Sequence, residues 1–362
     1  MSEHGLNISA APARGGAFPG RDPIAGMRVA VTGVTGFIGR ALVRHLHERG
    51  ATLTLLARAA PEGRPPDGAR VVALGDFTGL AGPDGAPAPA LVAALAGHDA
   101  VIHLAGRAHR AVGSGEAALA LYRAHNAAPA AAVAPAAASA GVPHMLFAST
   151  SYVHGHVTAP GRPFHGDSPL DPAGAYALSK AEAEMTLRRL AGGTGLAVTI
   201  FRPAAVYGPA PPANIRALAR AVGRGLPLPL ASVRNRRSFL GLDNLCDFIG
   251  HALARPPAAG GVAAWTLADA ERPSTPEFVR LLGAALERPA RLAPFPPALL
   301  RLGLVLAGRR GMAESLLDSF EIDVGAVSAA TGWRPPFTLA EGLRRMAQTP
   351  DRKSGAAGGA GA

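Results

Sequence analysis

Lysine is nearly absent from this sequence. Of its 36 lysine and arginine residues, only Lys180 and Lys353 are lysine, so arginine supplies almost all of the positive charge. Lys353 lies in a tail of glycine and alanine, where it needs no explanation. Lys180 lies inside the patterned part of the chain, so a lysine at this position indicates a specific role.

Cysteine and aromatic residues are also scarce. The single Cys246 excludes an intramolecular disulfide and a multi-cysteine metal site, and the histidines show no ligand spacing, so we predict no metal. Aromatic residues make up 5% of the chain and the arginines are dispersed. Nucleic-acid binders usually cluster basic residues and interleave them with aromatics, so we predict no nucleic-acid partner. The net charge of +11 suits a small anionic substrate instead.

No long, strongly apolar segment is present. The longest stretch without Asp, Glu, Lys or Arg, residues 124–161, is mostly alanine, which is too weakly apolar to favour insertion into a membrane. Residues 1–26 lack a basic segment followed by an apolar one, so no secretory signal is evident. With one cysteine, these features predict a cytoplasmic protein without membrane insertion.

Short apolar runs alternate with helical patterns along the chain. Residues 37–49 carry Ile38, Leu42 and Leu46 at helical spacing. The strand candidates are 27–31, 52–56, 71–74, 100–104, 144–148 and 197–201. Strands separated by helices predict an α/β fold with a doubly wound parallel sheet, covered by helices on both faces.

One expected helix contains prolines. Residues 116–141 have a helical composition but include Pro129 and Pro135. An interior proline costs a helix about 3 kcal/mol, so we expect a break or kink there.

The patterning divides the chain into four parts. We expect a disordered leader (1–26), a dinucleotide-binding domain (27–202), a smaller lobe that mainly binds substrate (203–348) and a flexible tail (349–362). Residues 263–267 within the lobe should return to the sheet.

A glycine-rich turn follows the first strand. Gly33, Gly36 and Gly39 are spaced G-x-x-G-x-x-G between a strand and a helix, where free N–H groups can bind a pyrophosphate. The alternative is a purely structural turn. Dinucleotide binding is favoured, and makes this a Rossmann-type fold. The predicted contacts in this turn are Gly33, Thr35, Gly36, Phe37, Ile38 and Gly39.

The next two strand ends bear on the choice of cofactor. The second strand ends at Arg58, without the acidic residue that commonly binds the ribose of NAD. Arg58 could contact the 2′-phosphate of NADP, so NADP is favoured over NAD, although it could also be a solvent-facing arginine. Asp76 could accept a hydrogen bond from the adenine amino group, with Phe77 beside it, or be a simple turn residue.

Tyr176 and Lys180 are four residues apart, which places them on one face of a helix. A neighbouring ammonium should lower the pKa of the phenol from about 10 and make it useful as an acid or base. Three hydroxyl residues, Ser149, Thr150 and Ser151, follow the strand 144–148, at the sheet edge where ligands bind. A hydroxyl there could contact a reacting oxygen, or the three could cap a helix or a turn.

These motifs, together with Asn126 and residues 201–209, resemble the extended short-chain dehydrogenases/reductases. The resemblance spans residues 27–347, and is closest to the NAD-dependent epimerase/dehydratase family that acts on nucleotide sugars. It implies that Thr150, Tyr176 and Lys180 are catalytic and that Asn126 supports the lysine through a water. The implied further cofactor contacts are Leu104, Ala105, Gly106, Tyr176, Lys180 and Pro203.

The chain departs from the family pattern at two places near Thr150. His154 stands where a V-Y-G turn usually has tyrosine. Ser151 and Tyr152 stand where dehydratases carry Asp-Glu, which argues against dehydration.

The resemblance also implies a substrate site. Thr150, Asn214 and Arg237 match residues that contact the sugar nucleotide, although Arg236 and Arg237 could instead be a solvated pair. The implied activity is NAD(P)-dependent chemistry at C4 of a UDP-hexose, in surface-polysaccharide synthesis. It would be either UDP-glucose 4-epimerase-like or a reductase of a UDP-4-keto-6-deoxy-N-acetylhexosamine. A homodimer is compatible with this family, and a non-catalytic dinucleotide-sensing scaffold is the alternative.

Overall fold

The computed structural model describes residues 22–61, 63–76, 80, 86–108 and 115–348. Most of the expected leader, and all of the expected tail, lie outside these residues. The expected leader boundary is wrong at its end. Ile24 is fully buried, and Asp22 forms an ion pair of 2.7 Å with Arg49, so the folded part already includes residues 22–26.

A parallel sheet of seven strands, in the order β3-β2-β1-β4-β5-β6-β9, forms the centre of the molecule and confirms the predicted fold class. Its strands are β1 (Arg28–Thr32), β2 (Thr52–Ala57), β3 (Arg70–Ala73), β4 (Ala100–His103), β5 (His144–Ala148), β6 (Ala197–Pro203) and β9 (Val262–Leu267). Every residue of β4, β5 and β6 is buried, as expected for strands covered on both faces.

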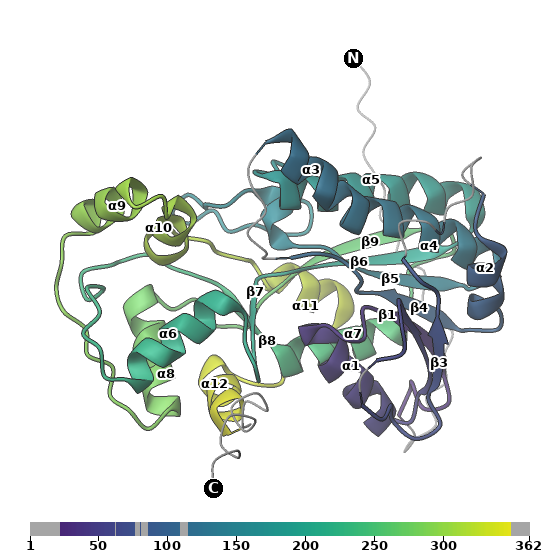
Figure 1. Cartoon of the computed structure of the whole chain (residues 1–362), viewed down its shortest axis with the longest axis horizontal. Coiled ribbons are helices and arrows are strands. Elements are labelled where there is room, and N and C mark those ends of the chain that lie inside the picture. The colour runs from purple at the N-terminus through teal and green to yellow at the C-terminus, as the bar shows by residue number, and fades with distance from the viewer. Residues whose placement is uncertain (1–21, 62, 77–79, 81–85, 109–114, 349–362) are drawn as a thin grey trace, which may run out of the picture.

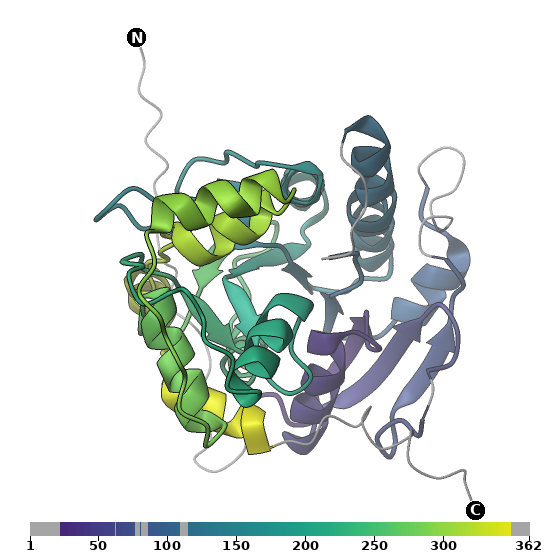
Figure 2. The same cartoon turned by 60° about the vertical axis from the view of Figure 1, so that its left-hand side comes forward.

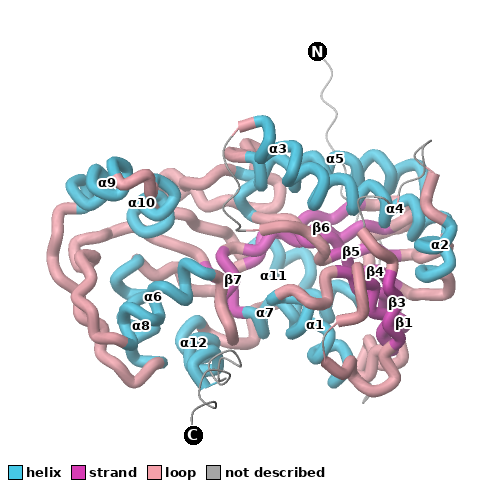
Figure 3. The backbone as a smooth tube through the Cα atoms, in the orientation of Figure 1, coloured by secondary structure: helices cyan, strands magenta, loops and turns pink. Residues whose placement is uncertain are grey.

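Helices cover both faces of this sheet (Figure 3). On one face lie α1 (Phe37–Glu48), α7 (Leu242–Leu253) and α11 (Gly325–Thr331). On the other lie α2 (Pro89–Leu95), α4 (Ala128–Ser139) and α5 (Ala175–Thr194). Each layer packs its apolar residues on the sheet, which gives two separate hydrophobic cores.

The proline-containing helix is continuous but changes its winding. It runs from α3 (Glu116–Tyr122) through a π-helical turn, η2 (Arg123–Ala127), into α4. The Ala128 N–H donates to the Arg123 carbonyl, five residues back, and Pro129 follows directly in the first turn of α4. The wider turn thus takes up Pro129, which has no N–H to donate. Pro135 lies inside α4.

A second unit lies at one end of the sheet (Figures 1 and 2). It holds a two-stranded parallel sheet, β7 (Ala205–Tyr207) and β8 (Phe239–Gly241), and a third hydrophobic core. Its helices are α6 (Ala213–Gly223), α8 (Thr275–Ala285), α9 (Pro297–Leu306), α10 (Arg310–Leu317) and α12 (Leu339–Gln348). Between α7 and α8, the chain returns to the large sheet as β9, which pairs with β6.

Asp269 ties the two units together. Its carboxylate accepts hydrogen bonds from the Tyr207 hydroxyl (2.7 Å), the Gly241 N–H (2.9 Å) and the Asn244 side chain (2.7 Å). These donors lie on β7, β8 and α7, while Asp269 follows β9. Burial raises the pKa of Asp269 to about 6 in spite of these bonds.

Among the described residues, no helix combines the length and apolarity needed to cross a membrane.

Candidate functional site

The glycine turn connects β1 to α1 at the carboxyl edge of the sheet. Gly33 has a φ of 73°, and a Cβ there would lie 2.6 Å from the backbone of Leu104 and Ala105. This turn therefore packs directly on the loop after β4, and no larger residue fits at Gly33. Gly36 caps α1, whose first turn has no acidic residue and no side-chain cap. Its free N–H groups fit a pyrophosphate.

A buried hydrogen-bond pair joins the ends of β1 and β4. Thr32 Oγ1 lies 2.9 Å from His103 Nδ1 and accepts a hydrogen bond of 3.2 Å from the Ala105 N–H. Burial, and then the charge of Lys180, lowers the pKa of His103 to about 3. The neutral imidazole of His103 therefore helps to hold the loop after β4, where Leu104, Ala105 and Gly106 are predicted cofactor contacts.

The predicted adenosine contacts lie farther along the same edge. Arg58 follows β2 with its side chain exposed, and Asp76 follows β3, also exposed. Phe77 lies outside the described residues. An exposed guanidinium at the end of β2 fits a ribose phosphate, and the choice of cofactor remains a prediction.

Thr150 and Tyr176 come together at the end of β5. Thr150 is the N-cap of the short 3₁₀-helix η3 (Ser151–His154), where its Oγ1 accepts a hydrogen bond of 3.3 Å from the Tyr152 N–H. Tyr176 lies in the first turn of α5, and a side-chain hydrogen bond joins it to Thr150. The ring of Tyr176 also packs edge-on against Tyr122, with 5.7 Å between centroids.

Lys180 reaches under this pair from the next turn of α5. Its Nζ donates a hydrogen bond of 2.7 Å to the Ala148 carbonyl and lies 4.8 Å from the centre of the Phe147 ring. Burial lowers the pKa of Lys180 to about 8. A Cβ on Gly106 would lie 3.2 Å from Nζ and 2.9 Å from Asn126 Oδ1, so this glycine permits the close approach.

Asn126 connects the π-helical turn to α5. Its Nδ2 donates a hydrogen bond of 2.9 Å to Ser179 Oγ, which in turn donates one of 2.8 Å to the Tyr176 carbonyl. Its Oδ1 accepts a hydrogen bond of 2.7 Å from the Arg107 N–H. Asn126 thus holds the loop after β4 beside the turn of α5 that carries Tyr176 and Lys180.

The expected pKa shift of Tyr176 is wrong in this structure. Burial raises the pKa of the phenol to about 12, and the hydrogen bond with Thr150 offsets only part of that rise. The Lys180 ammonium donates to the Ala148 carbonyl, and does not contribute to the shift of Tyr176. The effect of burial on the pKa of Tyr176 therefore outweighs the lowering that the sequence predicted from Lys180.

Comparison with known proteins places this arrangement in a family. The model of the NAD dependent epimerase/dehydratase family matches residues 29–265. The chain belongs to this family. It is 33% identical, over 321 residues, to a protein of Vibrio cholerae named UDP-glucose 4-epimerase, covering 88% of this chain and 94% of that protein.

Solved structures show the same fold. A UDP-N-acetylglucosamine 4-epimerase from Bacillus cereus superposes with a TM-score of 0.69 at 19% identity, covering 89% of this chain and 98% of that one. The dTDP-glucose 4,6-dehydratase DesIV from Streptomyces venezuelae, with NAD bound, has a TM-score of 0.67 at 25% identity, covering 89% and 96%.

Behind the site of this family member lies a buried ion pair that the sequence analysis did not single out. Glu184 and Arg202 pair through both carboxylate oxygens, with Nε 2.9 Å from Oε1, and both side chains are almost fully buried. Ser149, the residue before Thr150, donates a hydrogen bond of 2.5 Å to Glu184 Oε1. The pair therefore fixes the end of β5 from behind. The position of Glu184, four residues after Lys180, is the sequence signal that could have indicated it.

His154 belongs to the same buried network. Arg202 Nη1 lies 3.0 Å from its Nε2, and its Nδ1 lies 3.1 Å from the Pro169 carbonyl. Burial, and then the charge of Arg202, lowers the pKa of His154 to about 4. A neutral histidine that donates from Nδ1 and accepts at Nε2 satisfies both partners. This explains why histidine is accommodated in place of the usual tyrosine.

The predicted substrate residues have different environments. Arg237 is buried, so the alternative of a solvated pair is wrong for it, while Arg236 is exposed and contacts Glu321 at 3.1 Å. Asn214 lies exposed on α6. No hydrogen bond joins Asn214 to Arg237 within the part of the chain that the structure describes.

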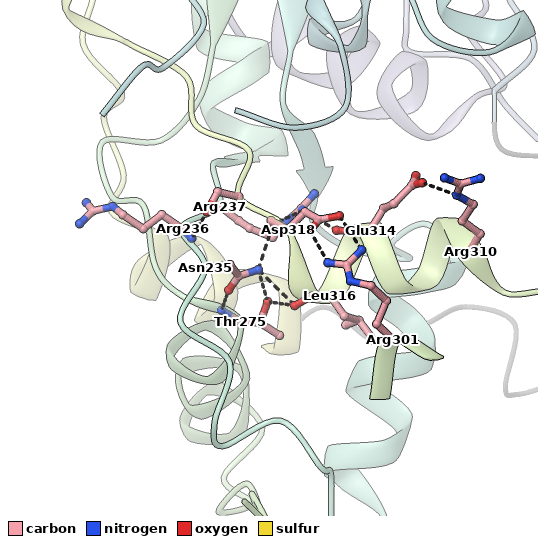
Figure 4. Close-up of polar contacts among 10 residues, drawn as sticks. Asn235, Arg236, Arg237, Thr275, Arg301, Arg310, Glu314, Leu316 and Asp318 are labelled. Carbon is pink, nitrogen blue, oxygen red and sulfur yellow. Dashed lines mark hydrogen bonds and ion pairs between the residues drawn. The ribbon is translucent and has the colours of Figure 1, made fainter. Parts of the chain in front are cut away.

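Arg237 lies against α10 and the aromatic residues near Thr150. Its Nη1 donates hydrogen bonds to the Asp318 carbonyl (2.9 Å) and the Glu314 carbonyl (3.2 Å), as Figure 4 shows. A side-chain hydrogen bond joins it to Tyr152, and its guanidinium lies 5.9 Å from the Phe320 ring. Burial lowers its pKa.

The described residues contain no cluster of three or more His, Cys, Asp or Glu that could hold a metal.

Proposed function

We propose that this protein catalyses NAD(P)-dependent oxidation or reduction at C4 of a UDP-hexose. The observation that carries the proposal is the hydrogen-bonded Thr150 and Tyr176 pair at the carboxyl edge of the parallel sheet. Similarity to the Vibrio cholerae protein named UDP-glucose 4-epimerase supports the choice of substrate. In this proposal residues 27–202 bind the dinucleotide and residues 203–348 mainly bind the sugar nucleotide.

The start of α1 fits a dinucleotide, because its first turn has no side-chain cap and no acidic residue, which leaves N–H groups free for a pyrophosphate. A bound nicotinamide would supply or accept a hydride at C4. The phenol of Tyr176 exchanges a proton with the C4 oxygen, and the Thr150 hydroxyl donates a hydrogen bond to that oxygen as its charge grows. Lys180, with a pKa of about 8, is mostly protonated near neutral pH and can donate a hydrogen bond to a ribose hydroxyl.

The protonated phenol of Tyr176 is compatible with the reductase version. Burial raises its pKa to about 12, so the phenol carries its proton at neutral pH. Arg58, exposed at the end of β2, favours NADPH, which a reductase exchanges at every turnover. Ser151 and Tyr152 offer no carboxylates beside Thr150, which disfavours dehydration. We therefore favour a reductase of a UDP-4-keto-6-deoxy-N-acetylhexosamine in surface-polysaccharide synthesis, with the 4-epimerase as the second candidate.

One experiment separates the two candidates. The purified protein is denatured, released nucleotides are identified, and the native protein is titrated with NADPH and NADH. Bound NAD that copurifies and resists exchange would support the 4-epimerase, which regenerates its cofactor in each cycle. A protein that binds added NADPH in preference to NADH would support the 4-keto reductase. A protein that binds neither contradicts both.

The cofactor preference gives a testable substitution. Arg58→Asp should weaken NADPH binding by about tenfold or more, since a carboxylate repels a 2′-phosphate and prefers a ribose hydroxyl. NADH binding should be kept or improved. Arg64→Asp, another exposed arginine with an 86% exposed side chain, is the matched control and should leave both affinities unchanged. Equal loss in both variants would contradict a role for Arg58.

A further inference from the structure

Helix α9 lies at the end of the molecule opposite the edge strand β3 (Figure 1). Helix α9 buries none of its residues. Leu299, Leu302 and Leu306 are 56%, 55% and 79% exposed, and their spacing of three and four residues places them on one helical face. We call the exposed apolar side chains of this region the α9–α10 surface: Phe295, Leu299, Leu302, Val305, Leu306 and Met312.

The chain around this surface lacks acidic residues. Residues 288–313 contain five arginines, and residues 208–242 contain six, without a single Asp or Glu in either segment. The two segments lie side by side, because the Leu228 N–H donates to the Arg291 carbonyl and the Ala293 N–H to the Leu228 carbonyl, each at 2.8 Å. This arrangement brings the exposed Leu226 of one segment to the neighbourhood of the other.

Several of these arginines are exposed. Arg301 and Arg310 pair with Asp318 and Glu314, which come after the acid-free segment. Six others are exposed and form no ion pair with any residue that the structure describes: Arg220, Arg224, Arg234, Arg288, Arg291 and Arg309. The region therefore combines exposed aliphatic side chains with uncompensated positive charge.

We propose that the α9–α10 surface docks on an anionic phospholipid bilayer. Leucines that enter the region between headgroups and acyl chains, flanked by guanidinium groups at headgroup level, are the features of an interfacial helix. The exposed side chains are aliphatic apart from Phe295, whereas single-stranded nucleic acids are held by several stacked aromatic residues. A second copy of the chain would bring its own arginines against these, and like charges oppose such contact.

Docking would take place beside the candidate substrate site. The carbonyls of Glu314 and Asp318, at the end of α10, accept the hydrogen bonds of Arg237 (Figure 4). The helix pair that meets the lipid is therefore anchored on the arginine assigned to the sugar nucleotide. The proposal goes beyond the proposed function and does not depend on it, since its test measures binding to vesicles.

The test is co-sedimentation of the full chain with vesicles. Vesicles of phosphatidylcholine and phosphatidylglycerol are compared with vesicles of phosphatidylcholine alone, at low and high salt. The protein should bind the anionic vesicles at low salt and be released by high salt. Leu302→Glu/Leu306→Glu should weaken binding by about tenfold or more, because it removes buried apolar area and adds negative charge. Arg309→Glu should weaken it by a smaller factor.

The matched control is Met185→Glu, which changes a residue 50% exposed on α5, away from this surface. It should bind vesicles like the unchanged protein. Absence of binding to anionic vesicles at low salt would overturn the proposal, as would equal loss in Met185→Glu. Self-association of the unchanged protein in solution that Leu302→Glu/Leu306→Glu abolishes, without vesicle binding, would identify a second copy as the partner instead. Circular dichroism confirms that each variant is folded.

Discussion

At the scale of single residues, burial moves the pKa values of Tyr176 and Lys180 in opposite directions. The pKa of the Tyr176 phenol is raised to about 12, and the pKa of the Lys180 ammonium is lowered to about 8. Both shifts favour the neutral form, because removal from water penalises charge. Tyr176 therefore carries its proton at neutral pH, as the proposed role of proton donor requires.

Replacement of Tyr176 by phenylalanine tests this role. Tyr176→Phe should lower kcat by about 10²- to 10⁴-fold, the contribution of a positioned acid, while dinucleotide affinity and the melting temperature stay close to those of the unchanged protein. Steady-state kinetics with a UDP-4-keto sugar, together with an NADPH titration, measures both. Unchanged turnover would remove Tyr176 from the mechanism. A variant that keeps its cellular function without turnover would favour the dinucleotide-sensing scaffold.

The sequence was sufficient to predict which residues form the candidate site. It was not sufficient to predict how buried they are or how their pKa values shift. Thr150, Tyr176, Lys180 and Asn126 were all named from motifs, and the structure brings them together. The raised pKa of Tyr176 and the neutral His154 depend on side chains distant in sequence, which spacing does not indicate.

At the scale of elements, the ion pair between Glu184 on α5 and Arg202 on β6 fixes helix against strand. Glu184→Gln should reduce the free energy of unfolding by about 3–5 kcal/mol, because Arg202 would be left as a buried charge without its partner. Glu182, two residues earlier on α5, pairs with Arg123 at the surface. Glu182→Gln is the control and should cost less than about 1 kcal/mol. Urea denaturation measures both, and equal losses would contradict a special role for the buried pair.

The contact between α1 and the glycine turn gives a second prediction at this scale. A Cβ on Gly39 would overlap the Gly33 carbonyl and lie 2.8 Å from Val34 Cα. Gly39→Ala should therefore displace α1, lower the melting temperature and weaken dinucleotide binding. Gly192, inside α5, has open space around its Cα. Gly192→Ala should instead stabilise the protein by about 0.5–1 kcal/mol and leave binding unchanged. Calorimetry and NADPH titration compare the two.

The strands of the large sheet were predictable because their apolar runs are short and separated by helical patterns, and the expected strand 144–148 coincides with β5. The small sheet of β7 and β8 was not predicted. Each of these strands has three residues, and they pair across more than thirty residues of intervening chain, so neither carries a periodic pattern of its own. The π-helical turn also had no signal beyond Pro129, because its winding depends on packing against α5.

At the scale of the whole molecule, three buried histidines make stability depend on pH. Burial lowers the pKa of His103 to about 3, and those of His144 and His154 to about 4. The unfolded chain binds these protons near pH 6.5, so stability is complete above that pH and is lost as the pH falls toward 4. Each histidine should remove about 1.4 kcal/mol per pH unit within this window.

The prediction is checked by the free energy of unfolding measured between pH 7 and pH 5. His144→Gln should make the decline shallower by about 1.4 kcal/mol per pH unit. Replacement of the exposed His165 by glutamine should leave the slope unchanged. A slope that is the same in all three proteins would show that His144 is protonated in the folded state.

The π-helical turn at Asn126 has a consequence for the evolution of the chain. Such a turn contains one residue more than an α-helix would need over the same length. Deletion of Ala127 would restore regular winding and rotate everything before it by about 100° around the helix axis. Asn126 would then lose Ser179 and Arg107, although no residue that touches substrate had been altered. The number of residues in this helix is therefore as important to the site as its side chains. Substitutions should be tolerated here far better than insertions or deletions.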